Sequence, residues 1–239
     1  KETASGLFVS ATMGVGQFCT NPGIVFYPDN KAGASFRNLF VEKMNSYESG
    51  VMLHKGIADS FLTGVKRVSD FEGVEELLEK KSVSVTGDCA VGPSVIHTDV
   101  KYFLSKPELA DEVFGPSTML VSYSNPDELL EVSNALDGQL TTSLFGTELS
   151  LQKNTDLLNI LETKAGRILF NQFPTGVEVC PSIVHGGPYP ATSDGRSSSV
   201  GTSAILRFSR PVCYQGFPQE LLPDELKDSN PLGIKRTES

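Results

Sequence analysis

The feature that most constrains the fold is an alternation of extended and helical patterns in the second half of the chain. Three strands and two helices are predicted in turn, over Ser117 to Tyr123, Asn125 to Leu136, Leu140 to Phe145, Thr155 to Thr163 and Arg167 to Phe170. Asn125-Pro126-Asp127 caps the first of these helices, and Gly166 ends the second. Strands joined by helices run parallel, so the pattern predicts an α/β fold with a mostly parallel sheet flanked by helices.

The first half of the chain predicts further helices and strands. Amphipathic spacing predicts three helices, over Phe36 to Met44, Ile57 to Val68 and Val74 to Lys80. Two short apolar runs, Leu7 to Ala11 and Val100 to Leu104, have the character of strands. The first of these runs enters a glycine-rich segment, Met13 to Gly23.

The last third of the chain changes in character. Residues Gln172 to Thr202 are rich in Gly, Pro, Ser and Thr and predict a long irregular loop, which in a compact domain is usually functional or disordered. Its aromatic and apolar content favours a packed, functional loop. Ala204 to Val212 predicts a last extended segment, and an acidic tail follows Phe217. We therefore expect one core-forming domain over residues 1–202 and a strand with a surface tail over residues 203–239.

Composition excludes several classes of partner. The chain has 239 residues with 20 Lys and Arg against 29 Asp and Glu, a net charge of −9, which argues against a nucleic acid or an anionic membrane as partner. The uncharged stretch from Thr3 to Pro28 superficially resembles a secretory signal, but it holds too many glycines and polar residues. Four cysteines and three histidines show no zinc-ligand spacing. We expect a cytoplasmic protein with reduced cysteines and no metal site.

One cysteine stands in the glycine-rich segment. Gly14 and Gly16 lack β-carbons, so a substrate could approach the Cys19 thiol closely, and backbone N–H groups in such a turn can stabilise an oxyanion. The alternative is a small buried cysteine in a tight turn, and spacing alone favours this alternative, since a free cysteine is often a core residue. A dinucleotide fingerprint is excluded, because Cys19 stands where the third glycine is needed.

Three ordered motifs make the chain similar to the aldehyde dehydrogenase superfamily. Gly14-Val-Gly-Gln-Phe-Cys19-Thr-Asn-Pro-Gly23 resembles its active-cysteine segment, and Asp111-Glu112-Val-Phe114-Gly-Pro116 resembles its Glu-x-Phe-Gly-Pro motif. Gly166-Arg-Ile-Leu-Phe-Asn171, continuing to Cys180, matches the strand and the turn near the substrate entrance. The continuations Val184 to Thr192 and Arg207 to Gln215 resemble the branch that oxidises 2,5-dioxovalerate, also called α-ketoglutarate semialdehyde.

The resemblance implies a role for each motif residue. Cys19 would attack the aldehyde as a thiolate, giving a thiohemiacetal; hydride transfer to NAD or NADP would leave a thioester that water hydrolyses to the acid. Glu112 would bind the nicotinamide ribose hydroxyls, and Phe114 would pack beside the nicotinamide.

The residues around the substrate are assigned more loosely. Gln17 and Phe18, which precede Cys19, and Asn171 are candidates for substrate binding. His185 stands where the superfamily often has an aromatic residue in the substrate tunnel, so we expect a pocket wall, with a catalytic His–Cys pair as the alternative. Arg196 could bind a substrate carboxylate, or it could be structural.

The resemblance also implies parts beyond these 239 residues. The superfamily's glutamate base, most of its cofactor site and an oxyanion-hole asparagine belong to an N-terminal domain, and Glu2 matches none of them. We therefore expect the isolated chain to be inactive alone, and to work with that domain in a homodimer or homotetramer. Two other functions remain open. One is a cysteine acyl-transfer enzyme or thioesterase, which needs a histidine near Cys19; the other is a non-catalytic oligomerisation module.

Overall fold

The computed structural model describes residues 1–79, 89–176 and 180–236. The chain divides into two compact units, Lys1–Ala204 and Ile205–Ser239, which are described separately. None of the described helices is long and apolar enough to cross a lipid bilayer.

The main sheet of the first unit has four strands in the order β1-β6-β5-β3. Their bounds are Ile24–Pro28 for β1, Ser117–Tyr123 for β6, Ser94–Asp99 for β5 and Glu75–Glu76 for β3. β1, β6 and β5 run parallel, with Met119 of β6 opposite Ile24 on one side and Ile96 on the other, whereas β3 is antiparallel. β6 is buried over its first five residues, as expected of a central parallel strand covered on both faces.

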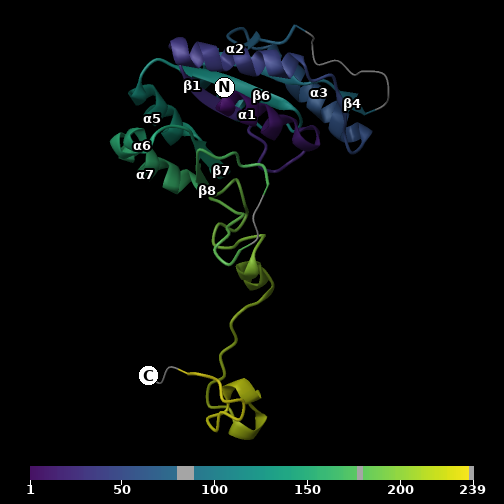
Figure 1. The fold of residues 1–239 in the computed structure, drawn as a ribbon. Helices are drawn as coiled ribbons and strands as arrows, with labels where there is room; N and C mark the ends of the chain where they lie inside the picture. The colour runs from purple at the N-terminus through teal and green to yellow at the C-terminus, as the bar shows by residue number, and fades with distance from the viewer. Residues whose placement is uncertain (80–88, 177–179, 237–239) are drawn as a thin grey trace. The chain divides into compact units, whose positions relative to one another are not determined.

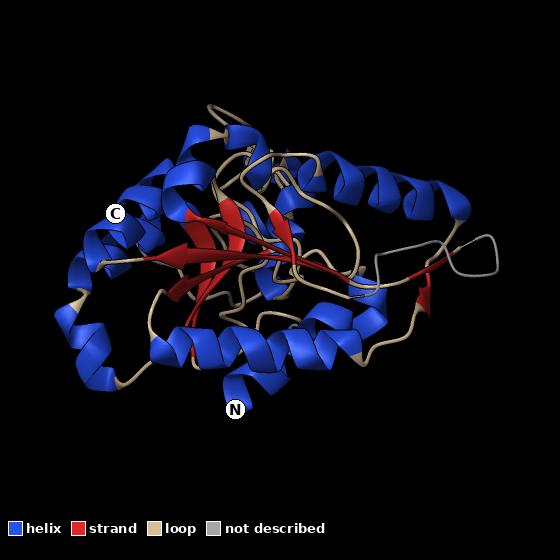
Figure 2. Cartoon of the chain, turned by 90° about the horizontal axis from the view of Figure 1, so that it is seen from above, coloured by secondary structure: helices blue, strands red, loops and turns tan. Residues whose placement is uncertain are grey.

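Helices cover both faces of this sheet, as Figures 1 and 2 show. Their bounds are Glu2–Thr12 for α1, Lys31–Asn45 for α2, Lys55–Ser69 for α3, Val100–Ser105 for α4 and Pro126–Ala135 for α5. Residues of α1 and α2 pack with Leu120 in one buried cluster, while Val68 of α3 and residues of α4 and α5 pack with Met119 and Val121 in another. Neighbouring residues of β6 thus enter opposite cores, which follows from the alternation of side chains along a strand.

Two smaller sheets complete the first unit. β7 (Gln139–Leu144) and β8 (Ala165–Phe170) pair in parallel, and the crossover between them carries α6 (Glu148–Lys153) and α7 (Thr155–Lys164). β2 (Gly50–Val51) and β4 (Ala90–Val91) form a short antiparallel pair.

The predicted α/β alternation is confirmed. β6, α5, β7, α7 and β8 lie within two residues of the predicted bounds. The side chain of Asn125 accepts a hydrogen bond from the backbone N–H of Glu128 at 3.0 Å, and Pro126 occupies the first turn of α5, as the capping pattern predicts. The predicted helices around Phe36 to Met44 and Ile57 to Val68 correspond to α2 and α3.

Three short predictions in the first half are wrong. Leu7 to Ala11 belongs to α1 rather than a strand, because its buried residues Ala4, Leu7 and Ala11 recur at helical spacing on one face. Val100 to Leu104 is helix α4, which begins where the side chain of Asp99 accepts from the N–H of Tyr102. In both cases a short apolar run fits a helix and a strand equally well until its buried face is known.

The third wrong prediction is the helix over Val74 to Lys80. Glu75 and Glu76 instead form strand β3, paired with His97 and Ile96 of β5, and Leu78 is buried in the core. Pairing and burial have overridden the helix propensity of the glutamates and leucines. Lys80 lies outside the described residues.

The predicted extended segment over Ala204 to Val212 is also not a strand. Thr202–Phe208 form 3₁₀ turns, whose hydrogen bonds are local, such as Ala204 N–H to the Gly201 carbonyl at 3.1 Å. A strand needs a partner edge, and the described residues supply none at this segment. Its predicted part in oligomerisation stays a prediction. In the second unit, Gln219–Leu221 and Asp224–Leu226 form further 3₁₀ turns.

Candidate active site

Cys19 lies in a tight turn between α1 and β1. A 3₁₀ turn over Met13–Gly16 precedes it, and Gly14, Val15 and Gly16 all have positive φ. The Cys19 side chain is exposed and the cysteine is free, so the interpretation of Cys19 as a buried packing residue is wrong. The glycine-rich segment therefore presents the thiol rather than hiding it.

The cysteine turn is docked on the motif that contains Glu112. Gly16 has a φ of +66°, and a β-carbon there would lie 2.2 Å from the carbonyl oxygen of Gly115. The side-chain amide of Asn21 donates a hydrogen bond to the same oxygen at 3.0 Å. The sequence-distant segments around Cys19 and Gly115 are thus in direct contact.

Cys19, Glu112 and Phe114 line one cleft of about 1480 Å³, which is also lined by residues of β1 and β7. The carboxylate of Glu112 is exposed and makes no hydrogen bond or ion pair with another described residue. Phe114 is 37% exposed. An unpaired carboxylate and a partly exposed aromatic ring beside a thiol leave room for a ligand with hydroxyl groups and a flat ring system.

His185 contacts the thiol directly. Its Nε2 atom lies 3.2 Å from Sγ of Cys19. The imidazole is positioned through its own backbone, because the N–H of His185 donates to the buried hydroxyl of Ser198 at 3.1 Å and its carbonyl accepts from the N–H of Ser199 at 2.9 Å. His185 is not among the residues that line the cleft of Cys19, Glu112 and Phe114, so its predicted role as a pocket wall stays a prediction, but the structure brings together the pair that the sequence left as an alternative.

The environment of His185 keeps its ring uncharged near neutral pH. Burial lowers the pKa of His185 below its ordinary value of 6.5, and the positive charge of Arg167 lowers the pKa further. Its Nδ1 atom is buried and has no hydrogen-bond partner among the described residues. A neutral imidazole with Nε2 unprotonated can accept the proton of the Cys19 thiol.

Gln17 and Phe18 support the cysteine turn. The Gln17 side chain donates to the Gly14 carbonyl at 3.0 Å and accepts from the N–H of Leu53 at 2.9 Å, so both ends of its amide are engaged. The Phe18 ring is 37% exposed and covers Gly14, where a β-carbon would meet it at 2.6 Å.

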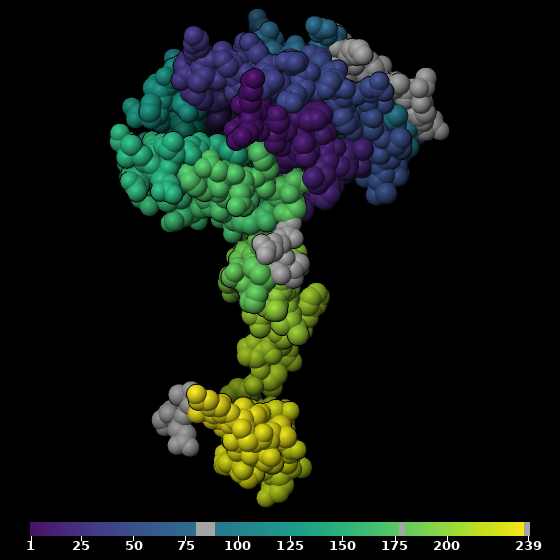
Figure 3. Space-filling view, viewed as in Figure 1, coloured from purple at the N-terminus to yellow at the C-terminus, as the bar shows by residue number. Residues whose placement is uncertain are grey.

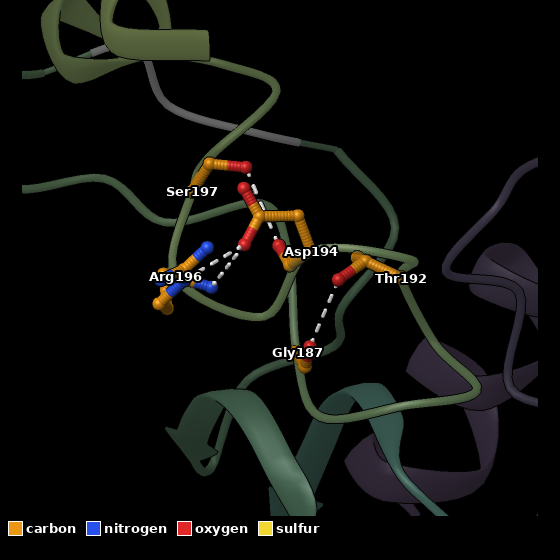
Figure 4. Close-up of polar contacts among 5 residues, drawn as sticks. All are labelled: Gly187, Thr192, Asp194, Arg196 and Ser197. Carbon is orange, nitrogen blue, oxygen red and sulfur yellow. Dashed lines mark hydrogen bonds and ion pairs between the residues drawn. The ribbon is translucent and has the colours of Figure 1, made fainter. Parts of the chain in front are cut away.

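Asn171 and Arg196 make hydrogen bonds to residues other than Cys19. Asn171 has a φ of +54°, and its side chain binds both the N–H and the carbonyl of Gly146 at 2.9 Å, joining the ends of β8 and β7. Arg196 is 94% exposed at its side chain and binds Asp194, in a turn shown in Figure 4 where Thr192 also binds the carbonyl of Gly187. Their substrate-binding roles stay predictions.

Two polar contacts at the site were not indicated by the sequence. The amide of Asn21, within the cysteine motif, anchors the turn to Gly115, and the hydroxyl of Thr20 donates to the carbonyl of Pro174 at 3.0 Å. Both residues stand in the recognised motif, but only the tertiary structure supplies their acceptors. Residues 177–179 of the third motif lie outside the described residues.

No metal centre can be assembled from the part of the chain that the structure describes. No group of three or more His, Cys, Asp or Glu side chains there could hold an ion. The cysteines Cys19, Cys89, Cys180 and Cys213 are all free.

Comparison with curated proteins finds relatives along nearly the whole chain. It is 44% identical over 233 residues to α-ketoglutaric semialdehyde dehydrogenase 2 of Azospirillum brasilense and 40% identical over 237 residues to α-ketoglutaric semialdehyde dehydrogenase of Acinetobacter baylyi. These alignments cover 98% and 99% of this chain but only 44% and 45% of the relatives. The chain thus spans less than half the length of these relatives. No protein-family model matches it.

Solved structures share the fold. The Δ-pyrroline-5-carboxylate dehydrogenase of Mycobacterium tuberculosis superposes with a TM-score of 0.72 at 16% identity, covering 92% of this chain and 42% of that one. An aldehyde dehydrogenase of Bacillus cereus gives a TM-score of 0.68 at 20% identity, covering 85% of this chain and 40% of that one. Over the part of their length that it covers, the chain is therefore similar to the curated dehydrogenases in sequence, and it shares the fold of the solved aldehyde dehydrogenase structures.

Proposed function

We propose that the chain carries the nucleophile of an NAD(P)-dependent aldehyde dehydrogenase that oxidises 2,5-dioxovalerate or a similar small semialdehyde to a carboxylic acid. The observation that carries the proposal is the exposed Cys19 thiol, which opens on the same cleft as Glu112 and Phe114. The substrate class is supported by relatives whose names contain α-ketoglutaric semialdehyde, at 40% and 44% identity.

In this proposal Cys19 is the nucleophile and His185 is the base that accepts its proton. The thiol proton passes to Nε2 of His185, and the resulting thiolate adds its electron pair to the aldehyde carbon, moving the carbonyl electrons onto oxygen. Backbone N–H groups of the cysteine turn are the candidate donors to that oxygen. Once the carbon has been oxidised, water attacks the thioester, and the thiolate that leaves recovers a proton.

The described residues fit a nicotinamide dinucleotide. Glu112 has free carboxylate oxygens that can accept from ribose hydroxyls, and the exposed face of Phe114 can pack beside a nicotinamide ring. When bound, this cofactor supplies the hydride acceptor. A structure of the Mycobacterium tuberculosis neighbour contains NAD, at a TM-score of 0.70 and 16% identity. NAD and NADP are both compatible with Glu112 and Phe114.

The resemblance implies further partners, which stay proposals. They are an N-terminal domain that supplies the remaining cofactor contacts and a glutamate base, and a second copy of the protein in a homodimer or homotetramer. The isolated chain is then inactive in aldehyde oxidation. We also propose a cytoplasmic location.

A second candidate function is favoured by one contact. The Cys19–His185 pair, at 3.2 Å, is the arrangement that a cysteine acyl-transfer enzyme or thioesterase requires. Such an enzyme hydrolyses an ester or thioester without a nicotinamide. No particular contact favours the third possibility, a non-catalytic oligomerisation module.

The test uses the complete protein that the reading frame encodes. It is assayed with 2,5-dioxovalerate and with aliphatic aldehydes of increasing length, with NAD and with NADP, and separately with a thioester in the absence of nicotinamide. We expect Cys19→Ala to lower aldehyde oxidation by at least about a thousandfold, as loss of a covalent nucleophile does, with Cys213→Ala as the matched control.

Each possible outcome is decisive. Equal or better use of long-chain aldehydes overturns the proposed substrate class. Thioester hydrolysis without aldehyde oxidation favours the acyl-transfer enzyme. If the Cys19→Ala protein oxidises aldehydes as fast as the wild type, the assignment of Cys19 as the nucleophile is overturned, and the oligomerisation module is favoured.

A further inference from the structure

Arg167, on β8, clamps the segment that follows this strand. Its guanidinium donates to the carbonyl of Pro174 at 2.7 Å from Nη2 and to the carbonyl of Gly176 at 3.3 Å from Nη1. Its Nε atom is buried without an acceptor among the described residues. An arginine held by two backbone carbonyls in this way is oriented, and no carboxylate among the described residues pairs with its positive charge.

The segment held by Arg167, from Pro174 to Gly176, is bonded in turn to the turn that contains Cys19. The carbonyl oxygen of Pro174 accepts a second hydrogen bond, at 3.0 Å, from the hydroxyl of Thr20, the residue directly after Cys19. Thr20 is only 4% exposed, so this bond is shielded from water. One carbonyl oxygen therefore joins the guanidinium of Arg167 to the neighbour of the nucleophile.

The same segment is fixed on its other side to α1. The hydroxyl of Thr175 bonds to the hydroxyl and the carbonyl of Ser10, and the Phe173 ring packs against Gly6, where a β-carbon would lie 2.2 Å from it. Figure 3 shows the purple atoms of α1 against the green atoms of this part of the chain. The Pro174 carbonyl is thus held from two directions.

Arg167 also acts on the other member of the pair. Burial is the first cause of the lowered pKa of His185, and the charge of Arg167 is the second. Among the described residues, the titratable group in hydrogen-bond contact with His185 is the thiol of Cys19, and the partners of His185 on its own loop, Ser198 and Ser199, are neutral. A nearby cation disfavours the imidazolium and so favours the form that accepts a proton.

We propose that Arg167 is the positioning residue of the Cys19–His185 pair: its hydrogen bonds fix the Pro174 carbonyl that holds the cysteine turn. Its positive charge has a second, supporting effect, since it favours the uncharged form of the imidazole. The inference rests on the proposed role of Cys19 as the nucleophile. Arginine suits both tasks, because its planar fork reaches two carbonyl oxygens at once and stays charged at every accessible pH.

The test separates the hydrogen bonds from the charge. In the complete protein, the rate at which iodoacetamide alkylates Cys19 is followed by peptide mass spectrometry as a function of pH, for the Arg167→Gln and Arg167→Lys variants. Arg236→Gln is the matched control, since Arg236 likewise donates to two carbonyls, those of Lys227 and Glu225, but in the second unit.

Arg167→Gln is expected to slow alkylation of Cys19 by about tenfold at neutral pH and to move the acid limb of the profile to higher pH, because His185 then protonates more readily. Arg167→Lys keeps the positive charge but loses the paired donors of the guanidinium. We therefore expect the acid limb of the alkylation profile to stay at the same pH, while the alkylation rate on the plateau falls about threefold. Arg236→Gln leaves both unchanged.

Several results would overturn the inference. If both Arg167 variants alkylate at the wild-type rate and with the wild-type pH profile, Arg167 has no effect on the site. If Arg167→Lys alkylates at the full wild-type rate, the two hydrogen bonds of the guanidinium are not needed to position the cysteine turn. If thermal unfolding shows that Arg167→Gln does not fold, Arg167→Lys alone decides. The proposed function is judged separately, by the substrate assays and by whether Cys19→Ala retains aldehyde oxidation.

Discussion

The Sγ atom of Cys19 lies 3.2 Å from Nε2 of His185, although 166 residues separate them in the sequence. The thiol is presented by a glycine-rich turn after α1, and the imidazole by the long irregular loop after β8. Neither segment has regular secondary structure at these two residues, so the contact depends on how each is anchored. The anchors are the Gly115 carbonyl for the turn and Ser198 and Ser199 for the histidine.

The pair leads to a prediction about pH. Because the pKa of His185 lies below 6.5, its imidazole is neutral at pH 7, and the alkylation rate of Cys19 should fall only as acid protonates the ring. His185→Gln should lower that rate at pH 7 by about 10²-fold, the usual contribution of a positioned base, and abolish this acid limb.

The control for this measurement is His54→Asn. His54 caps α3 by accepting from the N–H of Ile57, a task that asparagine performs equally well. An unchanged profile in His54→Asn and an altered one in His185→Gln supports the pair. A His185→Gln protein with the wild-type profile would show that another group takes the thiol proton.

Because Gly16 lies against Gly115, we expect a side chain at position 16 to lower both the stability of the protein and the reactivity of Cys19. In Gly16→Ala the new β-carbon would lie 2.2 Å from the Gly115 oxygen, at a φ of +66°. We expect a decrease of about 1–3 kcal/mol in the free energy of unfolding, measured by urea titration, together with slower alkylation of Cys19. Gly23→Ala is the control, since nothing lies within 4 Å of its β-carbon position. Equal stability of the two variants would contradict the close approach.

A substitution in the central strand β6 should have a large effect on stability, because its side chains are packed in the core. Leu120 is fully buried in β6 and packs with residues of α1 and α2. Leu120→Ala should lower the free energy of unfolding by about 2–5 kcal/mol, because it leaves a cavity in a closely packed core. Leu149→Ala, at a position 59% exposed on α6, should change it by less than about 0.5 kcal/mol. Similar losses in the two variants would be inconsistent with the described core.

The lowered pKa of His97 leads to a prediction of how the stability of the protein changes with pH. Burial first, and then the charge of Arg37, lower its pKa below 6.5, while Glu75 and Asp99 oppose this. The unfolded chain therefore takes up this proton at a higher pH than the folded protein does. The contribution of His97 to stability is present above pH 6.5 and is lost as the pH falls through its lowered folded-state pKa.

This sign is checked by urea unfolding at several pH values below 6.5. We expect His97→Gln to reduce the slope of the free energy of unfolding against pH in this window. A variant with the wild-type slope would show that His97 protonates equally in both states.

Long periodic segments were predictable, and short ones were not. The region of β6, α5, β7, α7 and β8 carries capping residues and a repeated pattern, so local preference and tertiary structure agree there. Glu75, by contrast, lies in a helix-like run but pairs as a strand with His97, because a free strand edge and a buried Leu78 outweigh a propensity of a few tenths of a kcal/mol per residue.

The candidate site was predictable in its residue types but not in its contacts. The motifs around Cys19 and Glu112 carry their chemistry in the sequence itself, because a nucleophile and a carboxylate are recognisable by type and order. Nothing in the sequence indicated that Thr20 and Arg167 share the Pro174 carbonyl, because both bonds end on a backbone atom that every residue possesses.

The sequence by itself determined the α/β class, the resemblance to the aldehyde dehydrogenase superfamily and the choice of Cys19 as the candidate nucleophile, since alternating periodicity and ordered motifs are local properties. Only the tertiary structure decided that Nε2 of His185 lies within hydrogen-bond distance of the Cys19 thiol. The physical reason is that a proton transfers over a hydrogen-bond distance, and that distance is set by packing between segments far apart in the chain.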